Sequence, residues 1–225
     1  MIHASVTLPR LSQSDHPSQK SIADNFFDDG PHMEWLDIIS VNRYIHACYQ
    51  YQTGQMPAQS WVRAFNETEH WWPIVLQHLL IGMNAHINQD LGIVAAETMP
   101  AGELADLKGD FDKINGVLAN LVGDLQGELA EIWPLLKLLN SALGNVETAI
   151  INFSMEKARD AAWSFAEKLS PLPTPQRKQA ILEKDEMMAL FSNVISHPGF
   201  YGSLIIGIIR LGERGTTRQR IEILE

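Results

Sequence analysis

The chain has 225 residues, of which 45% are hydrophobic, and its formal net charge is −10. This length and composition suit one globular domain with its own hydrophobic core. The acidic balance argues against nucleic acid and anionic membranes as partners, because both attract clustered Lys and Arg. No apolar run is long enough to span a membrane; the best candidate, 199–211, is too short. The single cysteine, Cys48, excludes an internal disulfide, so we expect a cytoplasmic protein in which Cys48 is a buried, inert thiol.

Helical periodicity runs through the chain, with Gly and Pro where one helix should end and the next begin. No alternating strand pattern and no repeat of fixed period occurs. The predicted helices cover about residues 32–52, 57–69, 73–98, 103–132, 134–144, 146–169, 174–196 and 202–212. The sequence therefore predicts an all-α, single-domain bundle of about seven to nine helices over residues 21–212. A flexible segment at 1–20 and a polar tail at 213–225 would flank this domain.

The predicted helix at 73–98 is apolar over much of its circumference, which is typical of a central helix surrounded by others. It nevertheless carries five polar residues: His78, Asn84, His86, Asn88 and Asp90. Polar side chains cost free energy in an apolar setting unless they find partners. At about 100° per residue, His86 and Asp90 share one face of an α-helix, and Asn84 and Asn88 share another. This polar cluster is the most informative feature of the sequence.

Two glycines, Gly82 and Gly92, also lie in the predicted central helix. Glycine lowers helix propensity, so its presence needs a compensating reason. We expect each to mark a place where a neighbouring helix or a ligand approaches the backbone closely.

The stretch LLIGMNAHINQDLG at 79–92 resembles the signature of a bacterial family of uncharacterised all-helical proteins, classed as a domain of unknown function. Other segments that resemble this family, in the same order, are FFDDGPHMEWLD at 26–37, NRYIHA at 42–47, DFDKINGVL at 110–118 and ARDAAWSFAEKL at 158–169. The resemblance covers about residues 25–200 and implies a helical fold, without an established activity. The polar residues that it matches are Asp37, Arg43, Tyr44, His78, Asn84, His86, Asn88 and Asp90.

One interpretation of the polar cluster is a metal site. His86 and Asp90 could ligate one divalent ion from a single helix, and His78 could be a third ligand from two turns away. Two histidines and a carboxylate suit Zn²⁺, Fe²⁺ or Mn²⁺ with open coordination positions, which would support hydrolysis or oxygen chemistry. The spacing of Glu67 and His70 is also of a metal-binding type, but it occurs once and near a helix end.

A second interpretation needs no metal. Asp90 could orient His86 as a general acid or base, with His78 beside them as a further catalytic group. Such an enzyme would carry out a hydrolytic or acid/base reaction on a small, partly apolar molecule. The residues predicted to contact that ligand are Arg43, Tyr44, Asn84 and Asn88.

The alternative is a non-catalytic binding or scaffold protein, in which the same side chains form a buried hydrogen-bond network. Arg43 would then pair with Asp37 or Asp90. His86 would donate a hydrogen bond to Asp90 or to a carbonyl, and the two asparagines would satisfy the backbone of neighbouring helices. The sequence is compatible with both interpretations, the enzyme and the non-catalytic protein.

Two apolar features add predictions of their own. An aromatic cluster consists of Trp61, Phe65, Trp71 and Trp72. Core packing is its simplest interpretation, and the alternative is one wall of an apolar pocket next to His78. Separately, the apolar residues of 203–211 could form a homodimer contact.

Overall fold

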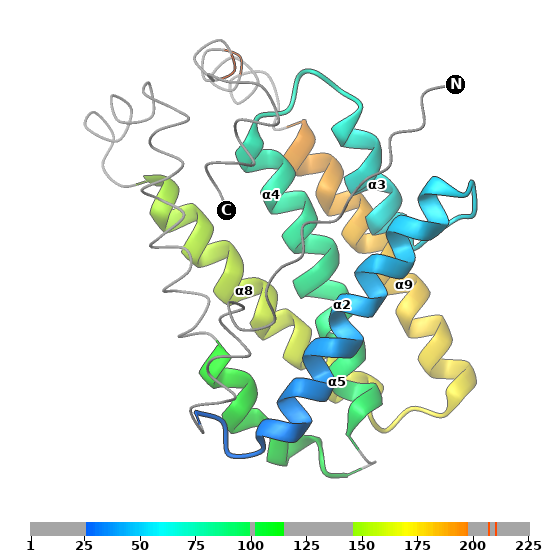
Figure 1. Cartoon of the computed structure of the whole chain (residues 1–225), viewed down its shortest axis with the longest axis vertical. Helices are drawn as coiled ribbons and strands as arrows, with labels where there is room; N and C mark the ends of the chain where they lie inside the picture. The colour runs from blue at the N-terminus through cyan, green and yellow to red at the C-terminus, as the bar shows by residue number, and fades with distance from the viewer. Residues whose placement is uncertain (1–25, 100–101, 115–145, 198–206, 208–209, 211–225) are drawn as a thin grey trace.

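The computed structural model describes residues 26–99, 102–114 and 146–197, together with Gly207 and Arg210. Within this part of the chain every regular element is helical, which confirms the predicted all-α class (Figure 1). Six complete α-helices are described, slightly fewer than the seven to nine predicted for the whole chain. They are α2 (Gly30–Gln52), α3 (Gln59–Thr68), α4 (Val75–Met83), α5 (Gly92–Thr98), α8 (Val146–Leu169) and α9 (Thr174–Ser196).

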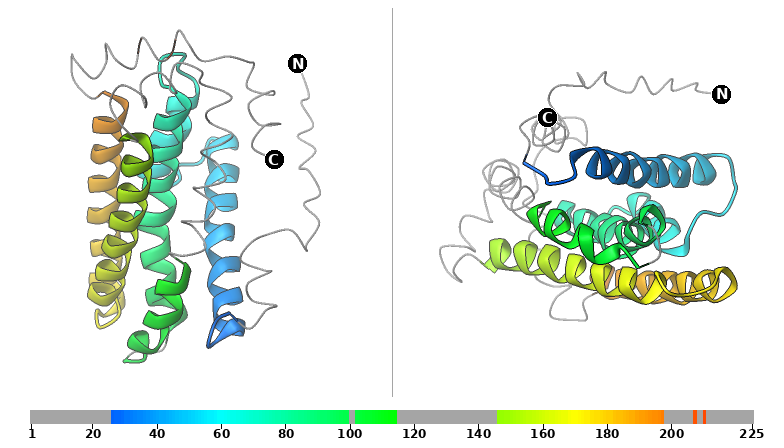
Figure 2. Two further views of the ribbon diagram at one scale, coloured as in Figure 1. Left: turned by 90° about the vertical axis from the view of Figure 1, so that its left-hand side faces the viewer. Right: turned by 90° about the horizontal axis from the view of Figure 1, so that it is seen from below.

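The centre of the molecule is a continuous helical rod that runs from Val75 to Thr98. It consists of α4, a π-helix at Asn84–Leu91, and α5. Figure 2 shows this rod lying between α2 on one side and the pair formed by α8 and α9 on the other. The predicted central helix at 73–98 is therefore confirmed, and its second half is the most deeply buried part of the described chain, with Ile93 and Val94 completely inaccessible.

Gly92 allows α8 to lie directly against the rod. A Cβ atom on Gly92 would lie 2.6 Å from the carbonyl oxygen of Ala162, which is a backbone atom and has no freedom to rotate away. The expected close approach of a neighbouring helix is thus observed at this glycine. Gly82 differs, because a Cβ there would meet no atom within 4 Å. Its surroundings are open space, which is consistent with approach by a ligand.

Helix ends follow the local capping signals. The predicted ranges 146–169 and 174–196 coincide with α8 and α9. α2 begins slightly earlier than predicted, because the Asp29 side chain caps it by accepting a hydrogen bond from the His32 amide at 3.1 Å. The predicted helix at 103–132 opens with a 3-10 turn at Leu104–Leu107. Residues 108–114 are helical, and 115–132 lie outside the described residues.

Several predictions lie on residues that the structure does not describe. These are the flexible segment 1–20, the helix at 134–144, the homodimer contact at 203–211 and the tail 213–225; of the helix at 202–212, only Gly207 and Arg210 are described. The domain limits at 21 and 212 therefore stay predictions. Among the described helices, none has both the length and the apolar character that crossing a membrane would require.

Two buried carboxylates accept hydrogen bonds from backbone amides near the starts of helices, and each carboxylate lies far from those amides in the sequence. Asp185 of α9 accepts hydrogen bonds from the amides of Gln59 and Ser60 at 2.6 and 2.9 Å, and so caps the start of α3. Asp110 accepts hydrogen bonds from the amides of Asp28 and Asp29 just before α2. Helix amino ends favour such acceptors, because their first N–H groups have no partner within the helix. These contacts hold α2 and α3 in fixed positions beside the central rod.

Candidate functional site

Four of the five residues of the predicted polar cluster lie on the π-helix, and His78 lies on the regular helix α4. A π-helix hydrogen-bonds from residue i to i+5, so each turn is wider and the faces differ from those of an α-helix. His86 and Asp90 nevertheless lie on the same side of the rod, as predicted, since both lie beside Trp61 of α3. Asp90 points between α2 and α3, whereas Asn84 and Asn88 reach toward α9. π-helical turns are rare and occur frequently at functional sites, which directs attention to this segment.

Asp90 is the anchor of the side that faces α2 and α3. Its carboxylate is only 1% exposed. One oxygen accepts a hydrogen bond from Arg43 Nε of α2 at 2.9 Å, and the other accepts from the indole Nε1 of Trp61 of α3 at 2.7 Å. The predicted pairing of Arg43 with Asp90 is thus confirmed. Asp90 therefore holds a cation and an aromatic ring in place, and no hydrogen bond joins it to His86 among the described residues.

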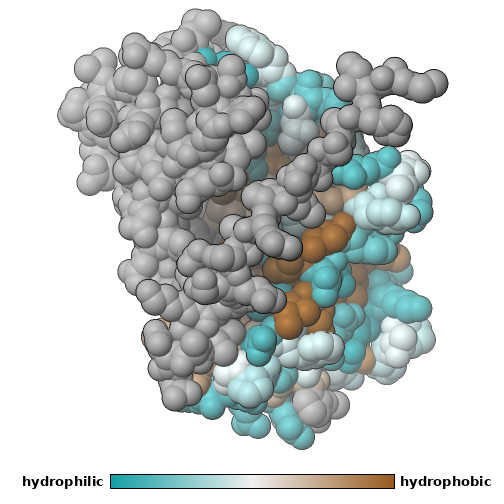
Figure 3. Space-filling view, in the orientation of Figure 1, coloured by the Kyte–Doolittle hydropathy of each residue, from teal (hydrophilic) through white to brown (hydrophobic). Residues whose placement is uncertain are grey.

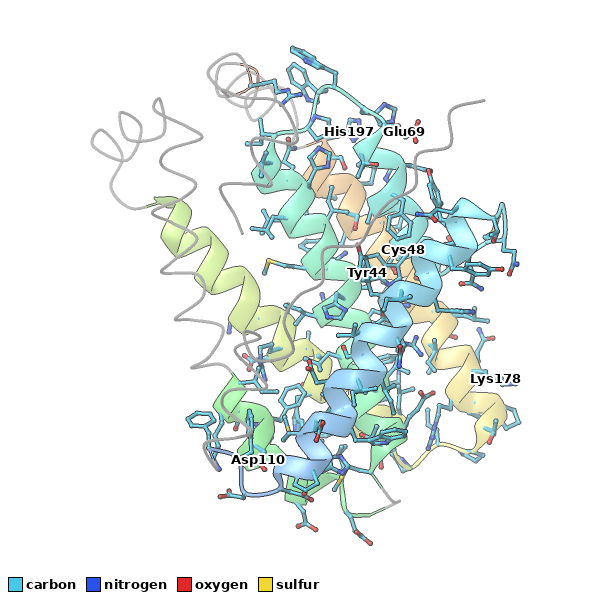
Figure 4. The ribbon with its side chains drawn as sticks, viewed as in Figure 1. Tyr44, Cys48, Glu69, Asp110, Lys178 and His197 are labelled. Atoms are coloured by element: carbon cyan, nitrogen blue, oxygen red, sulfur yellow. The ribbon has the colours of Figure 1, made fainter. Side chains whose placement is uncertain are left out.

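The fixed Trp61 ring is the centre of an aromatic wall. Phe65 stacks on it with ring centroids 5.5 Å apart and planes inclined by 21°. Tyr44 of α2, labelled in Figure 4, lies at 5.1 Å from the same ring on another side. The imidazole of His86 lies 6.3 Å from it. A single hydrogen bond to Asp90 therefore positions the Trp61 ring. The rings of Phe65, Tyr44 and His86 lie around it.

These rings line an open pocket of about 440 Å³ between α2, α3 and the central rod. Its aromatic and imidazole side chains are Tyr44, Trp61, Phe65, His78 and His86. Its aliphatic side chains are Val41, Ala64, Leu79, Met83 and Ile87. Thr68 and Gly82 complete the lining, which includes no formally charged side chain among the described residues. The predicted apolar pocket next to His78 is therefore present, with Trp61 and Phe65 as one wall.

The outer edge of this pocket continues into an apolar stripe on α2. Ile38, Val41 and Ile45 are all exposed, and Val41 also lines the pocket. Figure 3 shows apolar side chains gathered along α2 on the face toward the viewer. An apolar molecule would therefore meet apolar surface before it enters.

His86 is the pocket's most unusual polar group. Its Nδ1 atom is buried and has no hydrogen-bond partner among the described residues. Burial lowers the pKa of His86, because the imidazolium is poorly solvated; the charges of Asp90 and Asp37 oppose this effect but do not overcome it. The ring is therefore neutral near pH 7, and the residue lines the pocket.

Tyr44 also keeps its proton. Partial burial and the neighbouring Cys48 thiol raise the pKa of the Tyr44 phenol to about 12. The phenol is thus a neutral hydrogen-bond donor at the pocket wall. Cys48 was predicted to be buried, but the residue is only half-buried.

Asn84 and Asn88, which were predicted to contact a ligand, are engaged with α9. Asn84 Nδ2 donates to the carbonyl of Met188 at 2.8 Å and to Ser192 Oγ at 2.9 Å. Asn88 donates to Asn84 Oδ1 at 3.2 Å and accepts from Lys184 Nζ at 3.0 Å. For Asn84 this is the contact with a neighbouring backbone that the scaffold interpretation predicts. For Asn88 the partners are side chains.

Lys184 was not identified from the sequence. It is buried in α9, and burial lowers the pKa of its ammonium group. The available signal was its spacing, because Lys184, Met188, Ser192 and Ser196 follow at intervals of four and are all buried. This is the pattern of a helix face that packs inward.

The three predicted metal ligands do not come together. His78 and His86 line the pocket, whereas Asp90 lies outside the lining and its two oxygens are held by Arg43 and Trp61. No group of three His, Cys, Asp or Glu side chains in the described residues is arranged to hold a metal ion. The geometry of this part of the chain therefore offers no support for a metal site on His78, His86 and Asp90.

The aromatic cluster divides into two parts. Trp61 is buried, but Trp71 and Trp72 are exposed at the corner that leads into α4, with Trp71 65% accessible. Core packing is therefore wrong for these two tryptophans. The guanidinium of Arg210 lies 5.0 Å from the Trp71 ring, a cation–π distance.

Comparison with curated proteins and with solved structures finds no significant match. Comparison with protein-family models finds one, over residues 17–198, which contain the central rod, the pocket and α9. This range is most of the chain and agrees with the extent of the resemblance seen in the sequence. The chain therefore belongs to DUF5995, a family of unknown function.

Proposed function

We propose that this protein binds a small, partly apolar molecule in the pocket between α2, α3 and the central rod. The observation that carries the proposal is the open aromatic pocket lined by His86, a residue whose buried Nδ1 has no hydrogen-bond partner among the described residues. A buried nitrogen without a partner costs free energy, so a site that retains one gains when a ligand supplies the hydrogen bond.

The size and chemistry of the pocket support a ligand of this class. Sites for small molecules usually measure about 300–1,000 Å³ and combine apolar walls with a few polar groups. The volume here is about 440 Å³, and the polar groups are two imidazoles and two hydroxyls. A charged ligand group would lose its hydration without gaining an opposite charge, so we infer an uncharged ligand with an aromatic or apolar body.

The same groups could extend binding to acid/base chemistry. The neutral imidazole of His86 can accept a proton from a bound hydroxyl or from water. Tyr44 lines the same pocket, and its raised pKa keeps the proton on the phenol, which can donate a hydrogen bond. Asp90 would act indirectly, because it positions the Trp61 ring. We propose His86 as the base of any such reaction and Tyr44 as a hydrogen-bond donor to the bound molecule.

The test uses a neutral phenol, because a hydroxyl can bond to His86 while the ring stacks against Trp61. We expect 4-methylphenol to bind at one saturable site in calorimetric titration of the full chain. Ala64→Leu fills the pocket from α3 and should abolish this binding. The matched control is Ala189→Leu, which changes a groove between α3 and α9 and should leave binding intact. Equal binding by both variants, or none by the unmodified chain, would contradict the proposal.

A further inference from the structure

A second, more enclosed cavity lies next to the pocket on the central rod. It measures about 200 Å³ and lies between α4, the start of the π-helix, α8 and α9. Its apolar walls include Leu80 of the rod, Ala158 of α8, and Phe191 and Ile195 of α9. An engineered apolar cavity of about 150 Å³ is large enough to hold benzene. This cavity therefore has room for about six carbon atoms.

Met83 lines both spaces. On the rod, Leu79 and His86 face the aromatic pocket, whereas Leu80 and Asn84 face the second cavity. Met83 comes between these two faces. Methionine is unbranched and has three rotatable bonds, so it can move aside with little strain. The partition between the two spaces is consequently an adaptable side chain rather than backbone.

Three polar residues, Asn84, Asn88 and Lys157, line the second cavity, and each is already engaged; Lys157 Nζ lies 3.8 Å from an Asp160 carboxylate oxygen. The Asn84 amide donates to the carbonyl of Met188 and to Ser192, and it accepts from Asn88. The Asn88 oxygen accepts from Lys184. A ligand group here would find few free hydrogen-bonding atoms and several aliphatic walls. The second cavity thus suits an alkyl group, in contrast to the aromatic pocket, which is lined by two imidazoles.

We propose that the ligand is elongated, with a polar or aromatic head in the pocket beside His86 and an alkyl chain that passes Met83 into the second cavity. This inference rests on the proposed function, because it needs the head to bind first. It narrows the ligand class from small apolar molecules to those with a chain of about four to six carbons beyond the head, as the volume allows.

The experiment is a calorimetric titration of the full chain with 4-n-alkylphenols whose tails run from methyl to octyl. Burial of one methylene contributes about 0.8 kcal/mol, which corresponds to about a fourfold gain in affinity. We expect such a gain for each carbon added until the second cavity is full, followed by a plateau. The position of that plateau measures how far the chain reaches.

Two alanine variants separate the spaces. Ala158→Leu occupies the second cavity from α8 and should move the plateau to a tail several carbons shorter, while 4-methylphenol still binds as before. Ala64→Leu occupies the aromatic pocket and should weaken every member of the series. Leu80→Phe repeats the first test from the rod if Ala158→Leu does not fold, as judged by its thermal melting.

The outcomes distinguish this inference from the proposed function. If 4-methylphenol binds but longer tails add nothing, the elongated ligand is overturned and the pocket stands. An identical plateau in Ala158→Leu and in the unmodified chain also overturns it, because the gain would then come from elsewhere. If no member of the series binds, both proposals fail.

Discussion

The two sides of the central rod are built from similar residues. They differ in how closely their glycines are packed and in whether their buried polar atoms have hydrogen-bond partners. On the side of α8 and α9, Gly92 lies against the Ala162 backbone, and each side-chain polar atom of Asn84 is hydrogen-bonded even where it borders the second cavity. On the side of α2 and α3, Gly82 faces open space, and the Nδ1 atom of His86 is buried without a hydrogen-bond partner among the described residues. Close packing with full hydrogen bonding is typical of a structural interface, whereas unfilled volume with an unbonded polar atom is typical of a binding site.

The largest expected effect tests this contrast at the two glycines. Gly92→Ala should lower the free energy of unfolding by about 2–3 kcal/mol, because the new methyl group overlaps the Ala162 carbonyl and the helices must separate. Gly82→Ala should instead stabilise the protein by up to about 1 kcal/mol, since alanine favours helix and meets no neighbour. Urea denaturation measures both. Equal effects at the two positions would remove the distinction between a packed and an open side.

Asp90→Asn should cost about 2 kcal/mol of stability. The asparagine amide offers only one acceptor for the two donors, Arg43 Nε and Trp61 Nε1, that share the carboxylate. The cost should stay below that of breaking a fully buried ion pair, because the Arg43 side chain is 31% exposed and water can solvate it.

Trp61→Phe is the comparison variant for Asp90→Asn, because it removes the indole N–H donor and leaves the ion pair between Arg43 and Asp90 intact. We expect it to destabilise the chain less than Asp90→Asn while it weakens binding of 4-methylphenol. An unchanged thermal midpoint in Asp90→Asn would show that the carboxylate does not hold the aromatic wall.

Asn84→Ala should lower the free energy of unfolding by about 1–2 kcal/mol. The change leaves the Met188 carbonyl and Asn88 without their buried partner, and such unsatisfied groups carry the cost of desolvation. Binding of 4-methylphenol should be retained, because Asn84 is absent from the lining of the aromatic pocket. Chemical denaturation combined with calorimetry tests both parts. Lost binding in a folded Asn84→Ala variant would mean that the two sides of the rod are coupled.

The smallest effect is a dependence of stability on pH through His86. Its pKa is lowered in the folded chain, so the unfolded chain binds more protons between this lowered value and the usual pKa of about 6.5. Stability should therefore fall as the pH drops below about 6.5, until the folded pKa is passed. His86→Gln should flatten this part of the profile, and the exposed His70→Gln should not. A profile that is the same for all three proteins would contradict a buried neutral imidazole.

Much of the fold could be predicted because it depends on local chemistry. The ends of α8 and α9 follow from the glycine, asparagine and proline residues around them, and the buried rod follows from its apolar circumference. Polar residues in that rod also predicted where the chain would need partners, since an unpaired polar group in an apolar core is costly. For this reason the sequence and the structure point to the same helix for the candidate site.

Only the tertiary structure decided what those polar residues do. The partners of Asp90 come from 47 and 29 positions away, and the α9 partners of Asn84 come from more than 100 positions away. Such pairings depend on how the helices rotate against one another, and the π-helix changes that rotation by widening the turn at Asn84–Leu91. The sequence by itself determined that the rod would be buried and polar in places. Packing determined that Asp90 would fix Trp61, that Asn84 would hold α9, and that His86 would be left facing a pocket.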